Sequence, residues 1–429
     1  MKPYDACLQK MFGLRRFGIK LGLDVIDDIL KRLGDPQQRF NTIHVAGTNG
    51  KGSVAATLAS ILQASGFSVG LYTSPHLVRF NERIRVDGNP IGDADVVAAY
   101  EAVEAANRSE REPTFFEFST AMAFAHFGDR KVNWAVIETG MGGRLDATNI
   151  ITPQVSIITN ISLEHRDYLG KTLTAIAREK AGIIKPGVPV VTGTHQPGVL
   201  SVIRDAAERQ QAPLFRRGQE FRVRRNTSGT FDFHGLRHVW TGLKPALTGG
   251  HQVDNAALAL AACERLIEAG VPIEERTIRV GMEKTRWPGR LEVVSRSPLV
   301  ILDGAHNLMA ARNLARYLEG EMKNRRLTFV LGVLSDKPYQ AMLSAMLPIC
   351  SRAIITQAKI DRAIPAETLA VQARRFIDDV TVVPDVGDAV RIAIEGSAAD
   401  DAVCVAGSLY VVGEAMPEIG RLKAAGLLG

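Results

Sequence analysis

The chain has 429 residues, 46% of them apolar and 23% charged, which is the composition of a folded globular protein large enough for two domains. Its net charge of +6 comes from basic residues scattered in short pairs, so no basic run indicates a nucleic-acid partner. No apolar run is long enough to cross a bilayer, and the amino terminus has no secretory apolar region. The four cysteines are isolated, which argues against a zinc site or a disulfide framework and fits a reducing cytoplasm.

Apolar periodicity predicts helices and strands that alternate through the first two thirds of the chain. The predicted strands are 43–46, 69–72, 134–138, 155–159 and 188–191, and the predicted helices are 23–33, 51–65, 93 onward, 116–127, 173–181 and 251–268. Residues 74–90 are expected to form a loop, and residues 215–240 a small antiparallel insertion. Such alternation is typical of a mostly parallel sheet with helices on both faces.

The pattern changes at Thr285–Arg290, where Pro and Gly separate a helical pattern from a strand-like one. Beyond this point, strands predicted at 299–303, 328–334, 353–356, 380–383 and 403–406 again alternate with helices. This predicts a second, smaller α/β domain of the doubly wound type. The two domains are therefore expected at residues 1–286 and 287–429.

A glycine-rich loop, Gly47-Thr-Asn-Gly-Lys-Gly-Ser53, lies between a buried strand and an Ala-rich helix. Backbone N–H groups of such a loop and of the helix start form an anion site, and Lys51 can neutralise phosphate charge. The Ser53 hydroxyl is then available to a phosphate oxygen or to Mg²⁺. The spacing departs from the common Walker pattern because position 45 is Val. A glycine turn used only for packing would not need Lys followed by Gly-Ser.

A second glycine-rich segment follows the predicted strand 134–138. Glu138 ends this strand, and ligands of open α/β sheets bind at the carboxyl ends of strands. A carboxylate beside a phosphate loop is suited to hold Mg²⁺; the alternative is an ordinary surface carboxylate. The run Gly140-Met-Gly142 is not a dinucleotide fingerprint, because the third glycine is missing and no helix start follows.

The loop 47–53 resembles the nucleotide loop of the Mur-type amide ligases, and among them the branch of folylpolyglutamate and dihydrofolate synthases. Further segments resemble motifs of that branch in the same order: 73–77, 138–149, His165, 179–182, 288–290, 303–307 and 407–408. The resemblance implies a P-loop-type Mur-ligase central domain with a mostly parallel sheet, which binds ATP, in residues 1–286. It also implies a smaller Rossmann-like, glutamate-ligase domain in residues 287–429.

The resemblance assigns the metal ligands of two Mg²⁺ ions to Ser74, Glu138, His165 and Lys180. In the family the matching lysine is carbamylated by CO₂, which turns a cation that Mg²⁺ would repel into a carboxylate-like ligand. From the residues alone, Lys180 is equally well read as a surface lysine in a Glu-Lys pair, and His165 as a structural histidine.

The resemblance also implies ATP contacts for Asn49, Gly50, Lys51, Gly52, Ser53, Asn255, Arg290 and Asp303, and catalytic roles for Lys51, Lys180 and His306. Asp303 and His306 match positions that contact ATP and the incoming glutamate, although a buried Asp at a strand end also often caps the next helix. The pterin-bearing substrate is assigned to Thr114, Phe115, Phe116, Glu117, Leu145, Asp146 and Ala147, and glutamate to Ser408. Phe115 and Phe116 fit ring stacking or, equally, an apolar core.

By family analogy the chain is an ATP-dependent ligase that joins L-glutamate to dihydropteroate, to tetrahydrofolate (poly)glutamates, or to both, through an acyl phosphate. A monovalent cation is common in such ligases. We expect a cytoplasmic monomer with small-molecule substrates and no nucleic-acid or membrane partner. The alternatives are a Mur-type ligase for another carboxylate, a P-loop small-molecule kinase, and a binding module without catalysis.

Overall fold

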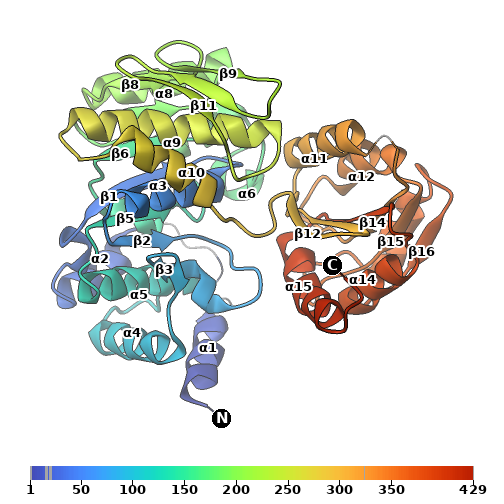
Figure 1. Cartoon of the computed structure of the whole chain (residues 1–429). Coiled ribbons are helices and arrows are strands. Elements are labelled where there is room, and N and C mark those ends of the chain that lie inside the picture. Colours follow the sequence, from blue (N-terminus) through green and yellow to red (C-terminus); the bar gives the residue numbers. More distant parts are fainter. Residues whose placement is uncertain (1, 15–17, 19–21, 323, 429) are drawn as a thin grey trace. The chain divides into compact units, whose positions relative to one another are not determined.

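The computed structural model describes residues 2–14, 18, 22–322 and 324–428. The chain forms two compact units, coloured from blue to yellow and from orange to red in Figure 1. The N-terminal unit comprises Met1–His76, Phe80–Ala246 and Gln252–Arg286, and the C-terminal unit comprises Leu77–Arg79, Leu247–His251 and Trp287–Gly429. In the described part of the chain, no helix has the length and apolar character needed to cross a membrane.

An eight-stranded sheet forms the centre of the N-terminal unit, in the order β4-β3-β2-β5-β1-β6-β7-β8. Its strands are β1 Asn41–Ala46, β2 Val69–Tyr72, β3 Ile84–Val86, β4 Asn89–Pro90, β5 Trp134–Glu138, β6 Val155–Ile158, β7 Val190–Thr192 and β8 Leu214–Arg216. The strands from β2 to β8 in this order are parallel, and β3 pairs antiparallel with both β2 and β4, so β3 alone of these eight strands runs in the opposite direction. The central strands β1, β5 and β6 are buried along almost their whole length, which explains their continuous apolar sequences.

The helices of this unit are α1 Pro3–Gly13, α2 Asp24–Arg32, α3 Lys51–Ala64, α4 Asp93–Ala106, α5 Phe115–Asp129, α6 Arg166–Leu169, α7 Leu173–Ala181, α8 Pro197–Arg209, α9 Gly250–Glu268 and α10 Glu275–Lys284. Helices α1, α2, α4 and α5 share one apolar core with residues of β2 and β5. Helices α7 and α8 share another with β1, β6 and β7. Helix α3 packs on β1, β2 and β5 and lies beside α10 (Figure 1).

Two expectations about the irregular segments are corrected. Residues 74–90 are not only a loop, because they contain a 3₁₀ turn and the short strands β3 and β4, which extend the sheet beyond β2. The antiparallel insertion is present as β9 Arg222–Arg225, β10 Phe231–His234 and β11 Val239–Leu243, but it begins later than expected. Phe215 lies in β8, which pairs in parallel with β7 and so belongs to the main sheet.

The C-terminal unit has a six-stranded sheet in the order β12-β13-β17-β14-β15-β16. The strands are β12 Glu292–Arg296, β13 Leu299–Leu302, β14 Leu327–Leu331, β15 Arg352–Ile355, β16 Val380–Val382 and β17 Ala402–Ala406; the helices are α11 Leu308–Glu321, α12 Tyr339–Met346, α13 Ala366–Ala373, α14 Val386–Glu395 and α15 Leu409–Ala424. Only β12 runs antiparallel. Separate apolar cores cover the two faces, so this unit is doubly wound and the predicted α/β fold class is confirmed.

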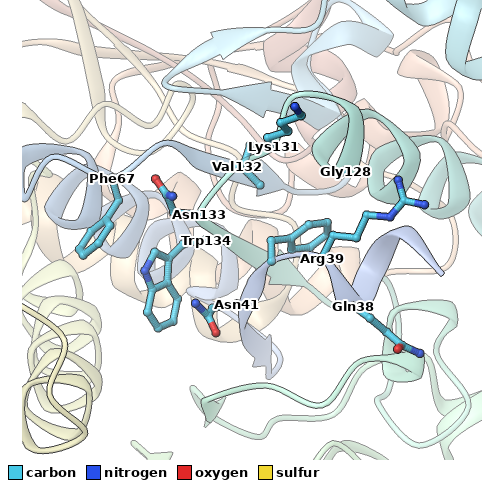
Figure 2. Close-up of a pocket in the computed structure, with 10 residues that line it drawn as sticks. Gln38, Arg39, Asn41, Phe67, Gly128, Lys131, Val132, Asn133 and Trp134 are labelled. Atoms are coloured by element: carbon cyan, nitrogen blue, oxygen red, sulfur yellow. The ribbon is translucent and has the colours of Figure 1, made fainter. Parts of the chain in front are cut away.

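A pocket of about 620 Å³ lies at the amino ends of β1 and β5, between Asn41, Phe67 and Trp134 (Figure 2). Arg39 also lines it, but its guanidinium donates to the backbone oxygens of Leu33 and Gly34. Ligands of open α/β sheets bind at the carboxyl ends of the strands. This pocket is at the other edge, so the candidate site is sought elsewhere.

Candidate active site

The loop between β1 and α3 has a backbone that only glycine allows at two positions. Gly47 and Gly50 have φ angles of 143° and 86°, and Gly50 is the residue that precedes α3. A Cβ on Gly47 would lie 1.9 Å from Thr159 Oγ1, and a Cβ on Gly50 would lie 2.3 Å from Asn255 Oδ1. The glycines therefore let the loop pack against its neighbours while its N–H groups stay at the start of α3, where an anion binds favourably.

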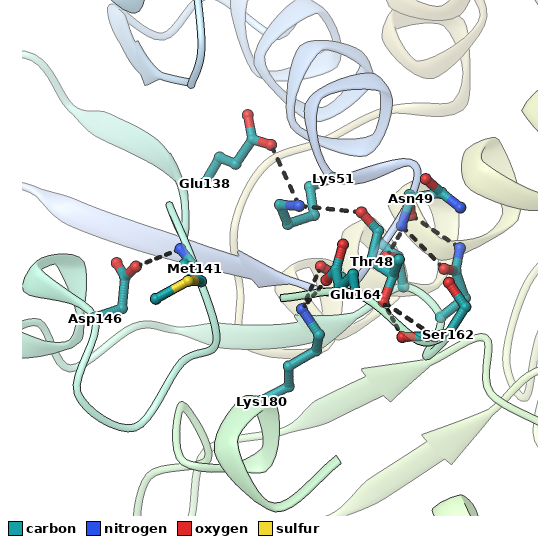
Figure 3. Close-up of polar contacts among 12 residues, drawn as sticks. Thr48, Asn49, Lys51, Glu138, Met141, Asp146, Ser162, Glu164 and Lys180 are labelled. Carbon is teal, nitrogen blue, oxygen red and sulfur yellow. Dashed lines mark hydrogen bonds and ion pairs between the residues drawn. The ribbon is translucent and has the colours of Figure 1, made fainter. Parts of the chain in front are cut away.

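The loop is fixed by hydrogen bonds to the segment that follows β6 (Figure 3). Asn49 accepts hydrogen bonds on its backbone oxygen from Thr159 Oγ1 at 2.7 Å and from Asn160 Nδ2 at 2.9 Å, and its N–H donates to Asn160 Oδ1. Thr48 Oγ1 accepts the N–H of Ser162 at 3.0 Å. The loop is thus held in one shape before any ligand binds. Neither Thr159 nor Asn160 is among the residues predicted for the site.

Lys51, Glu138 and Ser74 meet at the carboxyl ends of adjacent strands. The β1–β5 register pairs Val45 with Glu138, which places this carboxylate beside the loop. Lys51 Nζ lies 3.9 Å from Glu138 Oε1 (Figure 3). The Ser74 N–H donates to Glu138 Oε2 at 3.3 Å. Glu138 is only 5% exposed, so it is not an ordinary surface carboxylate. The structure brings these three predicted residues together.

The residues around Glu138 offer the donor set of a magnesium site shared with phosphate. Mg²⁺ prefers oxygen ligands and at phosphate sites is usually held by one or two carboxylates, substrate oxygens and water. Within the described residues, no three or more His, Cys, Asp or Glu side chains are grouped to hold a metal. The carboxylate of Glu138, with Ser74 next to it, fits a site completed by phosphate oxygens and does not form a cage made by protein alone.

Lys180 is buried beneath the loop and is not a surface lysine. Its side chain is 2% exposed, and its Nζ donates to Gly47 O at 2.8 Å and to Glu164 Oε1 at 2.6 Å (Figure 3). The neighbouring Glu179 pairs instead with Arg144 at 3.0 Å. The Glu-Lys surface pair considered from the sequence is therefore excluded for Lys180.

Burial and charge act in opposite directions on this ion pair. Burial alone would raise the pKa of Glu164, but Lys180 and Lys51 outweigh it and lower the pKa to about 2. Burial lowers the pKa of Lys180, and Glu164 opposes this shift. Glu164 is therefore a charged residue of the site that sequence reasoning missed; the only signal was its position directly before His165.

His165 lies on the exposed side of this group. It precedes α6 with a left-handed backbone, φ 45°, and its side chain is exposed, whereas Glu138 is buried. A non-glycine residue in this region costs roughly 1 kcal/mol and occurs often at functional sites. The structure places His165 next to Glu164, and its charge contributes to the lowered pKa of Glu164.

The second glycine-rich loop is packed tightly on the end of α7. A Cβ on Gly143 would lie 2.8 Å from Glu179 O, and a Cβ on Gly182 would lie 2.3 Å from Arg144 Cβ. The Arg144 N–H donates to Glu179 O at 2.7 Å. These glycines allow backbone contact between the loop after β5 and the helix that carries Lys180.

The residues predicted for the pterin substrate have different surroundings. Thr114 and Glu117 form a capping box at the start of α5, and Arg111 pairs with the Glu117 carboxylate at 2.6 Å. Phe115 is buried in the core, whereas Phe116 is half-buried and its ring lies against Gly140. Leu145 is half-buried, and Asp146 and Ala147 are buried. Phe116 is thus the better placed of the two phenylalanines for ring stacking.

In the N-terminal unit, Asn255 donates from Nδ2 to Gln252 Oε1 at 2.9 Å and packs against Gly50. In the C-terminal unit, Asp303 fixes the turn that carries Arg290. Its carboxylate accepts the N–H groups of Leu291 and Ala305, both at 2.9 Å, and burial raises its pKa.

Asp303 does not cap the next helix, because Asn307 is the cap of α11. His306 Nδ1 lies 2.8 Å from Gly304 O, and Arg290 Nη1 donates to Gly289 O at 3.0 Å. Ser408 is buried and caps α15 through the Tyr410 N–H. Arg290 lies just before β12, Asp303 and His306 follow β13, and Ser408 follows β17. Because β12 runs antiparallel to β13 and β17 runs parallel to it, these segments lie at one edge of the sheet.

Residues 45–263 match the Mur ligase middle domain, and residues 289–409 match the Mur ligase glutamate ligase domain. The dihydrofolate synthase/folylpolyglutamate synthase of Bacillus subtilis is 38% identical over 423 residues, which cover 96% of this chain and 98% of that protein. The chain belongs to the dihydrofolate synthase/folylpolyglutamate synthase family.

Solved structures of this family have the same fold. Escherichia coli FolC in complex with DHPP and ADP superposes with a TM-score of 0.90 at 34% identity, covering 97% of this chain and 98% of that one. The bifunctional folylpolyglutamate synthase/dihydrofolate synthase from Yersinia pestis, complexed with AMPPNP and Mn ion, gives a TM-score of 0.88 at 34% identity and covers 98% of both chains. The family resemblance inferred from the sequence motifs is therefore confirmed.

Proposed function

We propose that this chain is an ATP-dependent ligase that joins L-glutamate to dihydropteroate, to tetrahydrofolate and its polyglutamates, or to both. The observation that carries the proposal is the glycine-rich loop whose Lys51 lies 3.9 Å from the buried carboxylate of Glu138. Family relatives support it, since one was solved with DHPP and ADP and another with AMPPNP and Mn ion. The enzyme acts as a cytoplasmic monomer in this proposal.

ATP binds across the loop and the start of α3. The N–H groups of Gly50 and Gly52 face the phosphates, where the positive end of the helix dipole favours negative charge. Asn49, whose own N–H donates to Asn160 Oδ1, lines the same loop. Lys51 offsets charge on the transferring phosphoryl group, and the Ser53 hydroxyl contacts a phosphate oxygen. Asn255, which packs against Gly50, contacts the adenine side.

Ser74, Glu138 and His165 would hold the divalent cation, which we propose to be Mg²⁺, with two ions in the complete site. When bound, the cation supplies positive charge that offsets the charge on the phosphates. Carbamylation of Lys180 stays a prediction. It would place a second negative group against Glu164, which now contacts Lys180 Nζ at 2.6 Å, so Glu164 would have to turn away. A requirement for a monovalent cation also stays a prediction.

The reaction proceeds in two transfers. An oxygen of the substrate carboxylate attacks the γ-phosphorus of ATP, and the bond between the γ-phosphorus and the bridging oxygen breaks. ADP departs, and the substrate becomes an acyl phosphate. The amine of glutamate then attacks the acyl carbon, loses a proton and expels inorganic phosphate, which leaves an amide. Phe116, Leu145, Asp146 and Ala147 hold the pterin end, with Thr114, Phe115 and Glu117 shaping the start of α5. In the C-terminal unit, Arg290 and Asp303 contact the nucleotide, and His306 and Ser408 contact glutamate.

The test is phosphate release with ATP, Mg²⁺ and L-glutamate, with dihydropteroate in one reaction and tetrahydrofolate in another, and with products identified by mass spectrometry. Addition of one glutamate in both reactions shows a bifunctional enzyme, and addition in one names the single activity. A phosphorylated product without glutamate would favour a kinase. No product in either reaction, with an active control enzyme beside it, would overturn the pterin substrate.

A further inference from the structure

A buried chain of hydrogen bonds runs from the central strand β1 to Asp146. His44 Nε2 lies 2.8 Å from Thr148 Oγ1, and Thr148 Oγ1 donates to Asp146 Oδ1 at 2.5 Å. His44 and Thr148 are fully buried, and Asp146 is 5% exposed. Nothing in the proposed reaction uses His44, although a polar group buried in a central strand costs free energy unless it is paired.

The direction of the donors fixes the tautomer of His44. A hydroxyl has a single proton, and Thr148 donates its proton to Asp146. In the contact between His44 Nε2 and Thr148 Oγ1, the donor must therefore be His44 Nε2–H. His44 Nδ1 is buried without any hydrogen-bond partner. A bare lone pair is tolerated there better than an N–H group without an acceptor. Burial and then Lys185 lower the pKa of His44 to about 3, so the ring is neutral.

This tautomer favours the ionised form of Asp146. If Asp146 were protonated and donated to Thr148, the hydroxyl of Thr148 would turn to His44, and the ring proton would move to the unpartnered Nδ1. The Asp146 carboxylate also accepts the Met141 N–H at 2.8 Å on Oδ2 (Figure 3). Its Oδ1 accepts the Thr148 N–H at 3.1 Å. Burial raises the pKa of Asp146, and the hydrogen bonds from Met141, Thr148 and the Gly140 backbone oppose this shift.

We propose that His44 is a positioning residue that acts through Thr148 to keep Asp146 ionised and to orient its carboxylate toward an N–H edge of the substrate's flat ring. The substrate part of this inference rests on the proposed function. An ionised carboxylate only accepts hydrogen bonds, so the site favours ring systems with N–H or NH₂ donors along one edge. His44 itself need not touch the substrate.

The first experiment measures the binding of dihydropteroate to the whole chain without turnover, by the ligand's fluorescence, in wild type and in His44→Phe. We expect the dissociation constant to rise about tenfold, while that of AMPPNP changes less than twofold. Thr148→Val should weaken binding at least as much, and the double variant no more than Thr148→Val alone, because both act through one chain of contacts. Additive effects, or an unchanged constant in folded His44→Phe, would overturn the proposal.

His126→Phe is the matched control, because His126 is also a buried histidine of the N-terminal unit but lies in α5. It should leave the affinity for dihydropteroate unchanged. If His44→Phe does not fold, Thr148→Val and Thr148→Ser take its place: we expect weaker binding for Val and near-normal binding for Ser, which keeps the hydroxyl. Equal loss in both variants would contradict the inference.

A second experiment does not depend on the substrate. In ¹⁵N NMR spectra of the wild-type protein, the ring of His44 should be a neutral Nε2–H tautomer at pH 7, and its Nε2 signal should shift in Thr148→Val. A protonated Nδ1 would overturn the chain of contacts. If wild type binds no dihydropteroate but shows the Nε2–H tautomer, the proposed substrate fails while the positioning of Asp146 by His44 stands.

Discussion

A buried lysine beneath a phosphate loop needs a compensating charge, and Glu164 supplies it. The two side chains are nearly inaccessible to water, with Lys180 Nζ 2.6 Å from Glu164 Oε1. Removing one partner of such a pair leaves an uncompensated buried charge, which is costly. The pair therefore matters for stability and holds Lys180 against Gly47 of the loop.

We predict that Glu164→Gln destabilises the protein by about 3 kcal/mol at pH 7. The pKa of Glu164 falls from 4.5 to about 2 on folding, so its contribution is complete above the unfolded value and is lost as pH falls from about 4.5 toward 2. Urea unfolding at pH 7 and pH 3.5 should show a smaller difference between variant and wild type at the lower pH.

The control for this variant is Glu179→Gln. Glu179 lies on α7 next to Lys180 but pairs with Arg144, whose side chain is 57% exposed. Exposed pairs contribute less than about 1 kcal/mol, so this change should have a small effect at either pH. Equal effects of the two substitutions on the free energy of unfolding would show that the buried Glu164–Lys180 pair contributes no more than an exposed ion pair.

Lys51 is the residue whose loss should affect catalysis most directly. Lys51→Ala removes the cation that lies between the loop and Glu138, so we expect phosphate release to fall roughly a hundredfold or more. The unfolding midpoint should also fall, because the buried carboxylate of Glu138 loses a nearby cation, so phosphate release is compared at a temperature where both proteins are folded. Lys131→Ala, at the pocket on the opposite sheet edge, should keep full activity. Substantial phosphate release by Lys51→Ala would contradict the assigned role.

At the level of elements, the sequence predicted best those strands that are buried on both faces. The predicted strands 69–72 and 134–138 coincide with β2 and β5. A strand that is buried on both faces is a continuous apolar run, which can be recognised from the local sequence alone. The strands β3 and β4 have three and two residues. Segments so short show no periodicity, and the pairing of β3 with β2 and of β4 with β3 decides their structure. Thr159 and Asn160 could not be predicted either, because they hydrogen-bond to the loop 47–53 from over a hundred residues away in the sequence.

The motifs predicted which segments meet at the site but not what each side chain does there. Lys51, Glu138 and Ser74 come together because their strands are neighbours in a parallel sheet. Glu164 could not be singled out, because only the fold shows that Lys180 is buried next to it. Likewise, the sequence gives no sign that Glu117 is already paired with Arg111.

Helices α3 and α10 pack closely because α10 has a glycine at the contact. A Cβ on Gly281 would lie 2.5 Å from the Ile61 Cα of α3, and Ser60 Oγ donates to Gly281 O at 2.6 Å. We predict that Gly281→Ala destabilises the N-terminal unit by about 1–3 kcal/mol, the usual cost of overpacking. Thermal unfolding measures this directly.

Gly420→Ala is the matched control for the helix contact. Gly420 lies within α15, and a Cβ there meets nothing within 4 Å. Alanine is the better helix former, so this change should stabilise by about 0.5–1 kcal/mol. A loss of stability for both variants would point to a backbone effect common to the two glycines instead of the contact with Ile61.

At the scale of the whole molecule, each unit has apolar cores of its own. The expected boundary near Thr285–Arg290 lies where the chain passes from one unit to the other. No sequence pattern indicates that Leu77–Arg79 and Leu247–His251 belong to the C-terminal unit. A Cβ on Gly413 would lie 2.0 Å from Leu77 O, so the first of these segments is seated on α15 by a contact that no local pattern reveals.

Because the cores are separate, we predict two transitions in differential scanning calorimetry. Gly281→Ala should lower only the transition of the N-terminal unit, and Gly420→Ala should raise only the other, so the two variants assign the peaks. AMPPNP with Mg²⁺ at 100 times its dissociation constant adds about 2.7 kcal/mol to the unit that binds it, a shift of several degrees.

We expect this shift in the N-terminal transition of wild type and a much smaller one in Lys51→Ala, because the loop 47–53 and the start of α3 belong to that unit. A nucleotide shift confined to the C-terminal transition would contradict the assignment of ATP to the loop. A single transition, lowered by Gly281→Ala and raised by Gly420→Ala together, would instead show that the two units unfold as one cooperative body despite their separate cores.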